Sequence, residues 1–268
     1  MATQLLFYEN AVPVSSKKHA KLCVKAGESY AFASKINSVP LTASEFAEAA
    51  AEYPIVFAGE GENVVPTVIL GVAGSQNAYV SEKGGWGGRY IPAFIRRYPF
   101  VFSQETSDNQ LILHIDESFE GCNTDGRGEH LFDSEGNQTQ YLKNVLAFLQ
   151  DYQARFTRSQ SYCKRLVELD LLRPMQAQFT MPGGEKRSLT GFMTVDRDRL
   201  KALDGDMLKE MMSTDELECT FLHLNSLRHF GDVADRTASD AADAAATPKE
   251  EEKAAKASFK SKAKAKET

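Results

Sequence analysis

The sequence has no long hydrophobic run. The longest candidate, Val64–Val72, contains Pro66 and has the length of a strand, whereas a membrane-spanning helix needs about twenty apolar residues. At the N-terminus, Leu5, Leu6 and Phe7 are followed at once by polar residues, so the basic and then apolar order of a secretory signal peptide is also missing. We therefore expect no membrane insertion and a cytoplasmic location.

Cysteine is scarce and scattered. The four cysteines are Cys23, Cys122, Cys163 and Cys219, and no two of them form a CxxC pair. Because disulfide frameworks and cysteine zinc sites need closer spacing, the pattern predicts free thiols in a reducing compartment. The five histidines show no HxH, HxxxH or HExxH spacing either. We predict no metal centre and no cofactor.

Positive charge is in deficit. The chain has 31 basic and 37 acidic residues, a net charge of −6. Residues 237–268 hold 7 lysines and 6 acidic residues, which leaves residues 1–236 with a net charge of −7. An acidic body repels phosphate backbones, and binding by counterion release needs clustered cations. We therefore expect no nucleic-acid partner.

The motifs of the common catalytic loops are missing too. No serine lies in a GxSxG elbow. The glycine-rich loop Gly84–Gly88 matches neither the Walker pattern nor the dinucleotide pattern, because Trp86 interrupts it and Arg89 follows it. We interpret it as a tight turn that places the only tryptophan. As a ligand loop it would offer Trp86 for stacking and Arg89 for bidentate anion binding.

Two arginines follow this loop among aromatic residues. Arg96 and Arg97 lie in a segment that also contains Tyr90 and three further aromatic rings. Interleaved basic and aromatic residues can bind anions or single strands, or they can form an amphipathic turn whose arginines reach internal carboxylates. The candidate residues for ligand or partner binding are therefore Trp86, Arg89, Tyr90, Arg96 and Arg97. Exposure of these side chains decides between the two interpretations.

The segment from His114 to Asp133 concentrates side chains that hard metals prefer. Its acidic residues and histidines include Asp116, Glu117, Glu120, Asp125, His130 and Asp133. An EF-hand loop needs acidic residues at fixed positions around a glycine, and the registers centred on Gly126 and Gly136 both fail. We interpret the segment as a solvated acidic loop. An enzyme would require several of these carboxylates to meet His114 or His130 in one pocket.

The signals that are present predict an α+β fold with a mixed or mainly antiparallel sheet and a helical C-terminal half. Three strand pairings are expected: residues 55–57 with 64–72, residues 101–103 with 111–115, and residues 176–181 with 188–195. Apolar residues spaced three and four apart from Tyr141 onward predict a long helix with a break near residues 157–159.

Local signals refine this outline. Thr42 and Glu45 have the spacing of a capping box, as do Ser213 and Glu216. A short strand is expected at Tyr30–Ala33. We assign residues 1–236 to one globular domain and residues 237–268 to a disordered tail rich in Lys, Ala and Glu, because that stretch has too few apolar residues to offset the entropy of ordering.

One block of the chain resembles the bacterial SapC family. The block runs from Trp86 to the Arg-Arg-Tyr-Pro-Phe sequence at residues 96–100, and the resemblance spans roughly residues 5–230. Supporting pieces are Pro54–Phe57, Leu113–Asp116, Leu131-Phe132, Leu171–Pro174, Gly191-Phe192, Val195-Asp196 and His223–Leu227.

The resemblance implies a context but no catalytic residues. The family's name refers to a surface layer, and its members accompany TonB-dependent receptors and halogenase-like or cupin-like proteins. We therefore expect a non-enzymatic accessory or binding protein with a protein partner in a surface-layer or TonB-dependent uptake system. One alternative is an enzyme, metal-dependent or modifying, that uses residues 114–133. The other is a structural surface-layer component, which predicts export and self-assembly.

Overall fold

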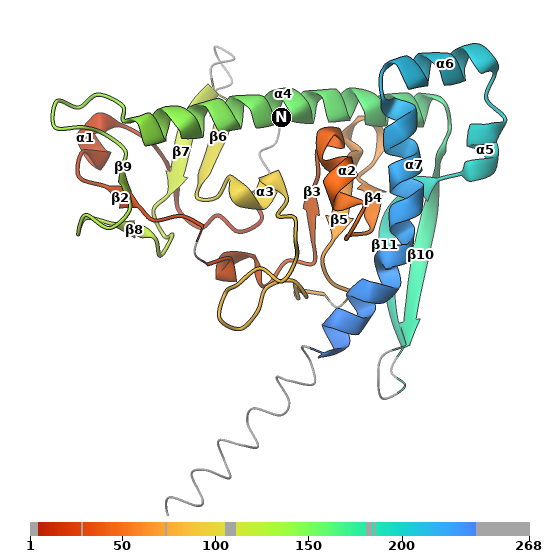
Figure 1. The fold of residues 1–268 in the computed structure, drawn as a ribbon, viewed down its shortest axis with the longest axis horizontal. Helices are drawn as coiled ribbons and strands as arrows, with labels where there is room; N and C mark the ends of the chain where they lie inside the picture. Colours follow the sequence, from red (N-terminus) through yellow and green to blue (C-terminus); the bar gives the residue numbers. More distant parts are fainter. Residues whose placement is uncertain are drawn as a thin grey trace, which may run out of the picture.

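A single long helix joins the two halves of the molecule (Figure 1). The computed structural model describes residues 5–27, 29–72, 74–104, 111–180, 184 and 186–239. Helix α4 (Gln140–Glu168) has 29 residues, which at about 1.5 Å per residue makes it roughly 43 Å long. Thr139 caps its first turn by accepting the N–H of Leu142.

Two hydrophobic cores lie along this helix. Leu142 and Leu149, from its first half, belong to the smaller core, together with Ile115. Tyr162 and Leu166, from its second half, belong to the larger core. Because one rigid element contributes to both cores, α4 fixes the position of one half of the molecule relative to the other.

Every strand pairing within the described residues is antiparallel. The strands are β1 (Ala11–Pro13), β2 (Cys23–Val24), β3 (Ser38–Pro40), β4 (Ile55–Ala58), β5 (Val65–Ile69), β6 (Phe100–Gln104), β7 (Leu111–Asp116), β8 (Cys122–Asn123), β9 (Glu129–His130), β10 (Leu172–Thr180) and β11 (Lys186–Val195). They form sheets of order β1-β7-β6, β8-β2-β9 and β10-β11-β4-β5-β3.

Short helices surround the sheets, and a helical run lies beside the largest one (Figure 1). The helices besides α4 are α1 (Ser16–His19), η1 (Ala31–Ala33), η2 (Ala43–Glu45), α2 (Phe46–Ala49), η3 (Gly61–Asn63), α3 (Ala93–Arg96), α5 (Arg197–Lys201), α6 (Gly205–Ser213), α7 (Glu216–Ser226) and η4 (Leu227–His229). Residues 230–239 continue as helix. No helix in these ranges is both long enough and apolar enough to cross a bilayer.

The structure confirms the predicted α+β class and its main pairings. Strands β4 and β5 pair as expected, and so do β10 and β11. Strand β6 pairs with β7 across residues 105–110, which lie outside the described ranges. The capping box at Thr42 is present, since Glu45 accepts the N–H of Thr42 at 2.9 Å.

Three local predictions are wrong. Tyr30–Ala33 is not a strand, because residues 31–33 form the 3-10 helix η1. Helix α4 has no break near residue 158, because the hydroxyls of Thr157 and Ser159 bond to carbonyls four residues earlier and are accommodated within the helix. Ser213 ends α6 instead of capping α7, whose N-cap is Asp215 in the left-handed region at φ 64°.

The folded body extends past the predicted boundary at residue 236. Residues 237–239 are helical, and Thr237 is fully buried. The Thr237 hydroxyl donates to the carbonyl of Val233 at 2.7 Å and accepts the N–H of Val72 at 3.4 Å. Residues 240–268, the rest of the predicted tail, lie outside the described residues.

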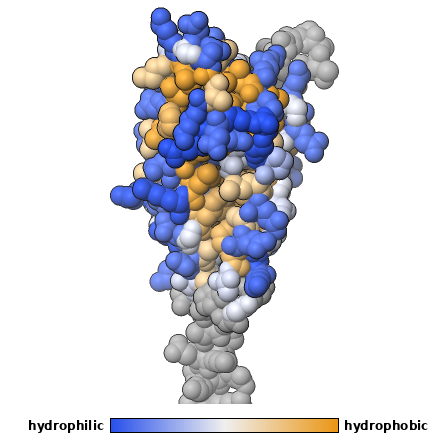
Figure 2. Space-filling view, turned by 90° about the vertical axis from the view of Figure 1, so that its right-hand side faces the viewer, coloured by the Kyte–Doolittle hydropathy of each residue, from blue (hydrophilic) through white to orange (hydrophobic). Residues whose placement is uncertain are grey.

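The side of the molecule formed by α5, α6 and the β10–β11 hairpin carries apolar surface. Figure 2 shows this surface above and below a hydrophilic band. Met212, Phe221 and Met175 are among the exposed large apolar side chains. Strand β10 is the edge strand of the largest sheet on this side.

Candidate functional site

Trp86 packs into the body instead of projecting from it. Its ring lies 5.8 Å from the ring of Tyr30 and 6.1 Å from that of Tyr79, centroid to centroid. Its indole N–H lies 3.1 Å from the hydroxyl of Tyr53 and 3.0 Å from the carbonyl oxygen of Tyr90. Because the polar end of the indole is bonded internally and the ring is half-buried, Trp86 holds its glycine-rich loop in place.

Tyr90 is also bonded internally. Its hydroxyl donates to Glu45 at 2.6 Å, and the same carboxylate oxygen accepts the N–H of Ala93 at 2.7 Å. Burial, and then the charge of Glu45, raise the pKa of the Tyr90 hydroxyl far above its usual value. The hydroxyl therefore stays protonated and fastens the start of α3 to η2.

The two adjacent arginines have opposite environments. Arg97 is buried, with its guanidinium 4.0 Å from the ring centroid of Phe94 and 5.2 Å from that of Tyr152. Arg96 is exposed, and its Nε donates to the carbonyl of Ile91 at 2.9 Å. Arg97 thus stabilises the interior by cation–π contacts, whereas Arg96 borders solvent.

The five candidate residues therefore do not form one binding surface. Arg89 and Arg96 are exposed, whereas Trp86 and Tyr90 are half-buried and Arg97 is buried. By the exposure criterion, the interpretation as an internally bonded turn holds for these last three. The physical reason is that the aromatic rings of this segment pack into the larger core and draw their polar groups in with them.

The acidic segment 114–133 does not converge either. Asp116 is fully buried and accepts the backbone N–H groups of Glu9, Asn10 and Ser118 at 2.8–3.0 Å. Asp133 is exposed and bonds to its own turn, and its pKa is lowered chiefly by the backbone N–H of Asn137.

The remaining members of that segment lie apart. Asp125 pairs with Arg127 at 3.3 Å in an exposed turn. The His114 ring contacts the Ser103 hydroxyl at 3.3 Å on β6. No group of three or more metal-ligating side chains occurs anywhere in the part of the chain that the structure describes. Among the described residues, the carboxylates of this segment therefore do not gather with His114 or His130 into a metal-binding group.

One cysteine meets a histidine. The sulfur of Cys23 lies 3.4 Å from Nδ1 and 3.5 Å from Nε2 of His130, its cross-strand partner. Because the sulfur is nearly equidistant from both nitrogens, it does not lie along a nitrogen lone pair. Cys23 is also fully buried. The pair therefore lacks the geometry of a nucleophile and its base.

The other thiols are held protonated. Burial raises the pKa of Cys122 and of Cys219 to about 11, and it raises the pKa of Cys163 further. All four cysteines are unpaired, as the sequence predicts. A thiol with a raised pKa is a poor nucleophile at neutral pH.

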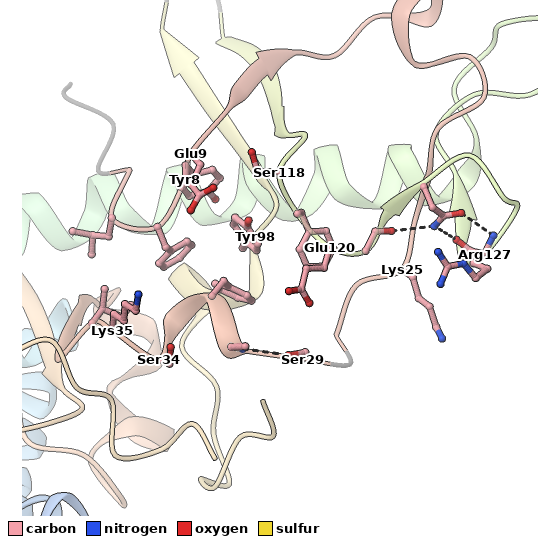
Figure 3. Close-up of a pocket in the computed structure, with 18 residues that line it drawn as sticks. Tyr8, Glu9, Lys25, Ser29, Ser34, Lys35, Tyr98, Ser118, Glu120 and Arg127 are labelled. Atoms are coloured by element: carbon pink, nitrogen blue, oxygen red, sulfur yellow. Dashed lines mark hydrogen bonds between the residues drawn. The ribbon is translucent and has the colours of Figure 1, made fainter. Parts of the chain in front are cut away.

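A different part of the molecule forms a groove of about 750 Å³ (Figure 3). Its walls come from three segments, residues 6–9, residues 25–36, and residues 118–127, with Tyr98 at the centre. Five aromatic side chains line it: Phe7, Tyr8, Phe32, Tyr98 and Phe119. The Tyr98 ring is stacked on that of Phe32 at 4.1 Å and meets the edges of Phe7 and Phe119 at 5.2 Å.

Charged side chains surround this aromatic centre. Lys35 lies at one end of the groove, and Lys25 and Arg127 lie at the other (Figure 3). Glu9 and Glu120 lie between the two ends (Figure 3). All five are exposed. The groove thus offers an apolar middle together with charges of both signs, which is the composition of a site for a ligand with apolar and charged parts.

Asp116 holds one wall of the groove in place. Its bonds to the amides of Glu9 and Asn10 fix the N-terminal segment, and its carboxylate also accepts the Tyr98 hydroxyl at 3.3 Å. Tyr8 then reaches the carbonyl of Phe100 at 2.8 Å. A single buried carboxylate therefore holds the N-terminal wall and the central ring in fixed relation.

Sequence reasoning missed this groove. Phe7, Phe32 and Phe119 are distant in sequence, and none lies in a recognisable motif. The one local signal is the adjacent aromatic pair Phe7-Tyr8, which follows Leu5 and Leu6 near the N-terminus.

The family model for SapC matches residues 14–233, most of the chain and all but the first of the groove's three segments. The chain belongs to the SapC family. No curated protein and no solved structure matches this SapC family member. The family match confirms the resemblance carried by the block from Trp86 to Phe100, and it assigns no activity to the groove.

Proposed function

We propose that this SapC family member is a non-enzymatic binding protein that holds a segment of a partner polypeptide in its aromatic groove. The observation that supports the proposal is the groove itself, in which five aromatic rings are bordered by three cations and two carboxylates. A polypeptide supplies apolar side chains for the centre and both signs of charge for the edges. Aromatic residues and arginine are also enriched where proteins bind proteins.

The charged edges favour a polypeptide over a small apolar ligand. Lys35, Glu9 and Glu120 form no ion pair with any other described residue, so their charges are available to a partner. The groove is also elongated, with Lys35 and Arg127 at opposite ends (Figure 3). An extended chain can contact both ends and the centre at once.

The family resemblance directs the search for the partner. It suggests proteins of a surface layer or of a TonB-dependent uptake system, and an accessory role beside them. The proposal includes a cytoplasmic location, which cell fractionation tests. Peptides from candidate partner proteins can then be compared with peptides selected from a random library.

The test selects displayed random peptides on the full-length protein and measures the best binders by isothermal titration calorimetry. The charge-swapped double variant Lys35→Glu/Glu120→Lys changes the groove without changing the net charge. We expect it to weaken peptide binding at least about tenfold, because charge complementarity at the two edges is reversed. The fluorescence of Trp86, the only tryptophan, gives a second readout, because its ring contacts Tyr30 within the groove segment 25–36.

The matched control swaps charges outside the groove. Glu82→Lys/Lys83→Glu alters two exposed residues before the glycine-rich loop and also preserves the net charge. It should bind the selected peptides as the wild type does. If the two double variants bind equally well, or if no peptide is enriched, the groove is not a polypeptide site and the proposal fails.

A further inference from the structure

Among the described residues, no strand pairs with the outer edge of β10. Strand β10 ends the largest sheet, and within the described residues its neighbour is β11 on one side alone. Natural sheets protect long edges with lysines, other charges, prolines or covering segments, because an open row of N–H and C=O groups recruits further strands. From Pro174 to Thr180 this edge carries seven consecutive uncharged residues.

Within β10, a proline protects the edge only near the start of the strand. Pro174 lacks an N–H, but Met175 and the residues after it in β10 have one. Met175, Gln176, Gln178 and Thr180 are exposed along this stretch. The neighbouring strand is different, because β11 starts with Lys186 and Arg187. The two strands of the hairpin therefore differ in charge, because β11 starts with two basic residues whereas Pro174–Thr180 of β10 has none.

The outer half of the hairpin is a two-stranded ribbon. The register pair that joins β11 to β4 is Met193 with Phe57, and no described residue of β11 before Met193 pairs with β4. From there the two strands continue together out to Thr180 and Lys186, with a register shift between Met175 and Ala177. A two-stranded ribbon is marginally stable alone, whereas three or more strands with a packed face are stable.

One face of the ribbon is already covered. Phe179 lies 6.0 Å and Phe192 lies 5.6 Å from the ring of Phe230, in the helical run that follows α7. The opposite face exposes Gln176, Gln178 and Thr180. The ribbon therefore has one packed face and one face in contact with solvent. What it lacks, within the described part of the chain, is a strand along its edge.

We infer that β10 pairs with β10 of a second copy of this chain, antiparallel, about a twofold axis near Ala177. A closed twofold contact uses the same surface on both copies, so the side chains near the axis must be compatible with the same side chains of the other copy. An edge of one charge would repel itself, whereas the uncharged Pro174–Thr180 stretch does not. The two ribbons then form four continuous strands, with their packed faces on the same side.

The lower apolar area in Figure 2 lies at the height of this hairpin. Met175 of β10 is 47% exposed. Pairing along the edge covers side chains that flank the axis on both faces, in addition to satisfying the open backbone groups. The interface is independent of the aromatic groove, whose walls come from residues 6–36, 98 and 118–127.

The test is sedimentation velocity of the full-length protein over a dilution series. The wild type should form a dimer. The variant Gln176→Lys/Gln178→Lys brings four lysines together on one face of the paired edge, and it should weaken the dimer at least about tenfold. The control Ser188→Lys/Thr190→Lys adds the same charge to exposed positions of the inner strand β11, and it should leave the dimer within about threefold of the wild type.

Hydrogen exchange on the wild type gives a measurement that needs no variant. The amides of Met175–Thr180 that point away from β11 should become protected as the protein concentration rises. A wild type that stays monomeric, or a dimer that the edge lysines do not weaken, overturns the inference. Unchanged exchange of these amides in the dimer overturns it as well, since the contact then lies elsewhere.

Discussion

The carboxylate of Asp116 accepts the backbone N–H of Asn10 at 3.0 Å, across more than a hundred residues of chain. The same side chain accepts the N–H of Glu9 and the hydroxyl of Tyr98. A buried carboxylate is stable where several donors surround it. The end of β7 therefore organises both the N-terminal segment and the centre of the groove.

Replacing Asp116 with alanine should lower the free energy of unfolding by about 3 kcal/mol, because three backbone N–H groups lose their acceptor. Asp116→Asn keeps one carbonyl oxygen and should cost less. Urea denaturation measures both variants. Asp125→Ala, in an exposed turn, is the control and should change the stability by less than about 0.5 kcal/mol. Equal stability of Asp116→Ala and the control would contradict the anchoring role.

The adjacent arginines provide a matched pair. Arg97→Ala should destabilise the fold by about 2–3 kcal/mol, because its buried stem and its contact with Phe94 are lost together. Arg96→Ala should cost under about 1 kcal/mol, because its guanidinium is exposed. Thermal and urea denaturation of both variants measure the difference. Similar losses from the two substitutions would show that Arg97 does not act as an internal residue.

His223 should make stability depend on pH. The backbone N–H of Val195 donates to its Nε2 at 3.0 Å, and its Nδ1 lies 2.7 Å from the carbonyl of Ile55, so the neutral ring satisfies both neighbours. Burial lowers its pKa from 6.5 to about 4. Between these pH values the unfolded chain binds a proton that the folded chain does not. The free energy of unfolding therefore falls as the pH falls, by up to about 3 kcal/mol.

The variant His223→Gln isolates this contribution. Glutamine can accept from Val195 and donate to Ile55, but it does not titrate. The stability of the wild type should decrease more steeply than that of the variant between pH 6.5 and pH 4, as measured by urea denaturation at each pH. Parallel curves for the two proteins would show that His223 does not titrate on unfolding.

The thiols should react slowly in the folded protein. Raised pKa values keep Cys122, Cys163 and Cys219 protonated near pH 8, so little thiolate is present. Titration with a thiol-specific disulfide reagent should show Cys163 reacting only on unfolding, and Cys122 and Cys219 reacting slowly before it. In denaturant all four cysteines should react quickly. Fast labelling of Cys163 in the native protein would contradict its burial.

The sequence by itself determined the elements whose interactions are local. The capping box of Thr42 and Glu45 needs residues three apart, and the hairpin β4–β5 needs two β-branched stretches close together in the chain. Strands β10 and β11 lie on either side of the sequence Pro-Gly-Gly at residues 182–184 in the same way. Such patterns are legible because the contacts that stabilise them lie within a few residues.

Only the tertiary structure decided which side chains face inward and which sites form. The sequence Arg96-Arg97 does not say which arginine is buried. Successive residues of α3 and its C-cap point in different directions, and only the position of Phe94 and Tyr152 selects Arg97. Glu45 takes part in a local contact and in distant ones. One carboxylate oxygen accepts the N–H of Thr42 in the capping box, and the other accepts from Tyr90 and Ala93.

The groove and the outer edge of β10 likewise depend on the tertiary structure. Phe7, Phe32 and Phe119 meet because the chain folds around Tyr98 and because Asp116 ties down its N-terminal segment. Strand β10 lies at an edge because β4, more than a hundred residues earlier, pairs with β11 instead. Contacts between distant segments depend on how the whole chain packs, and no local spacing in the sequence records that arrangement.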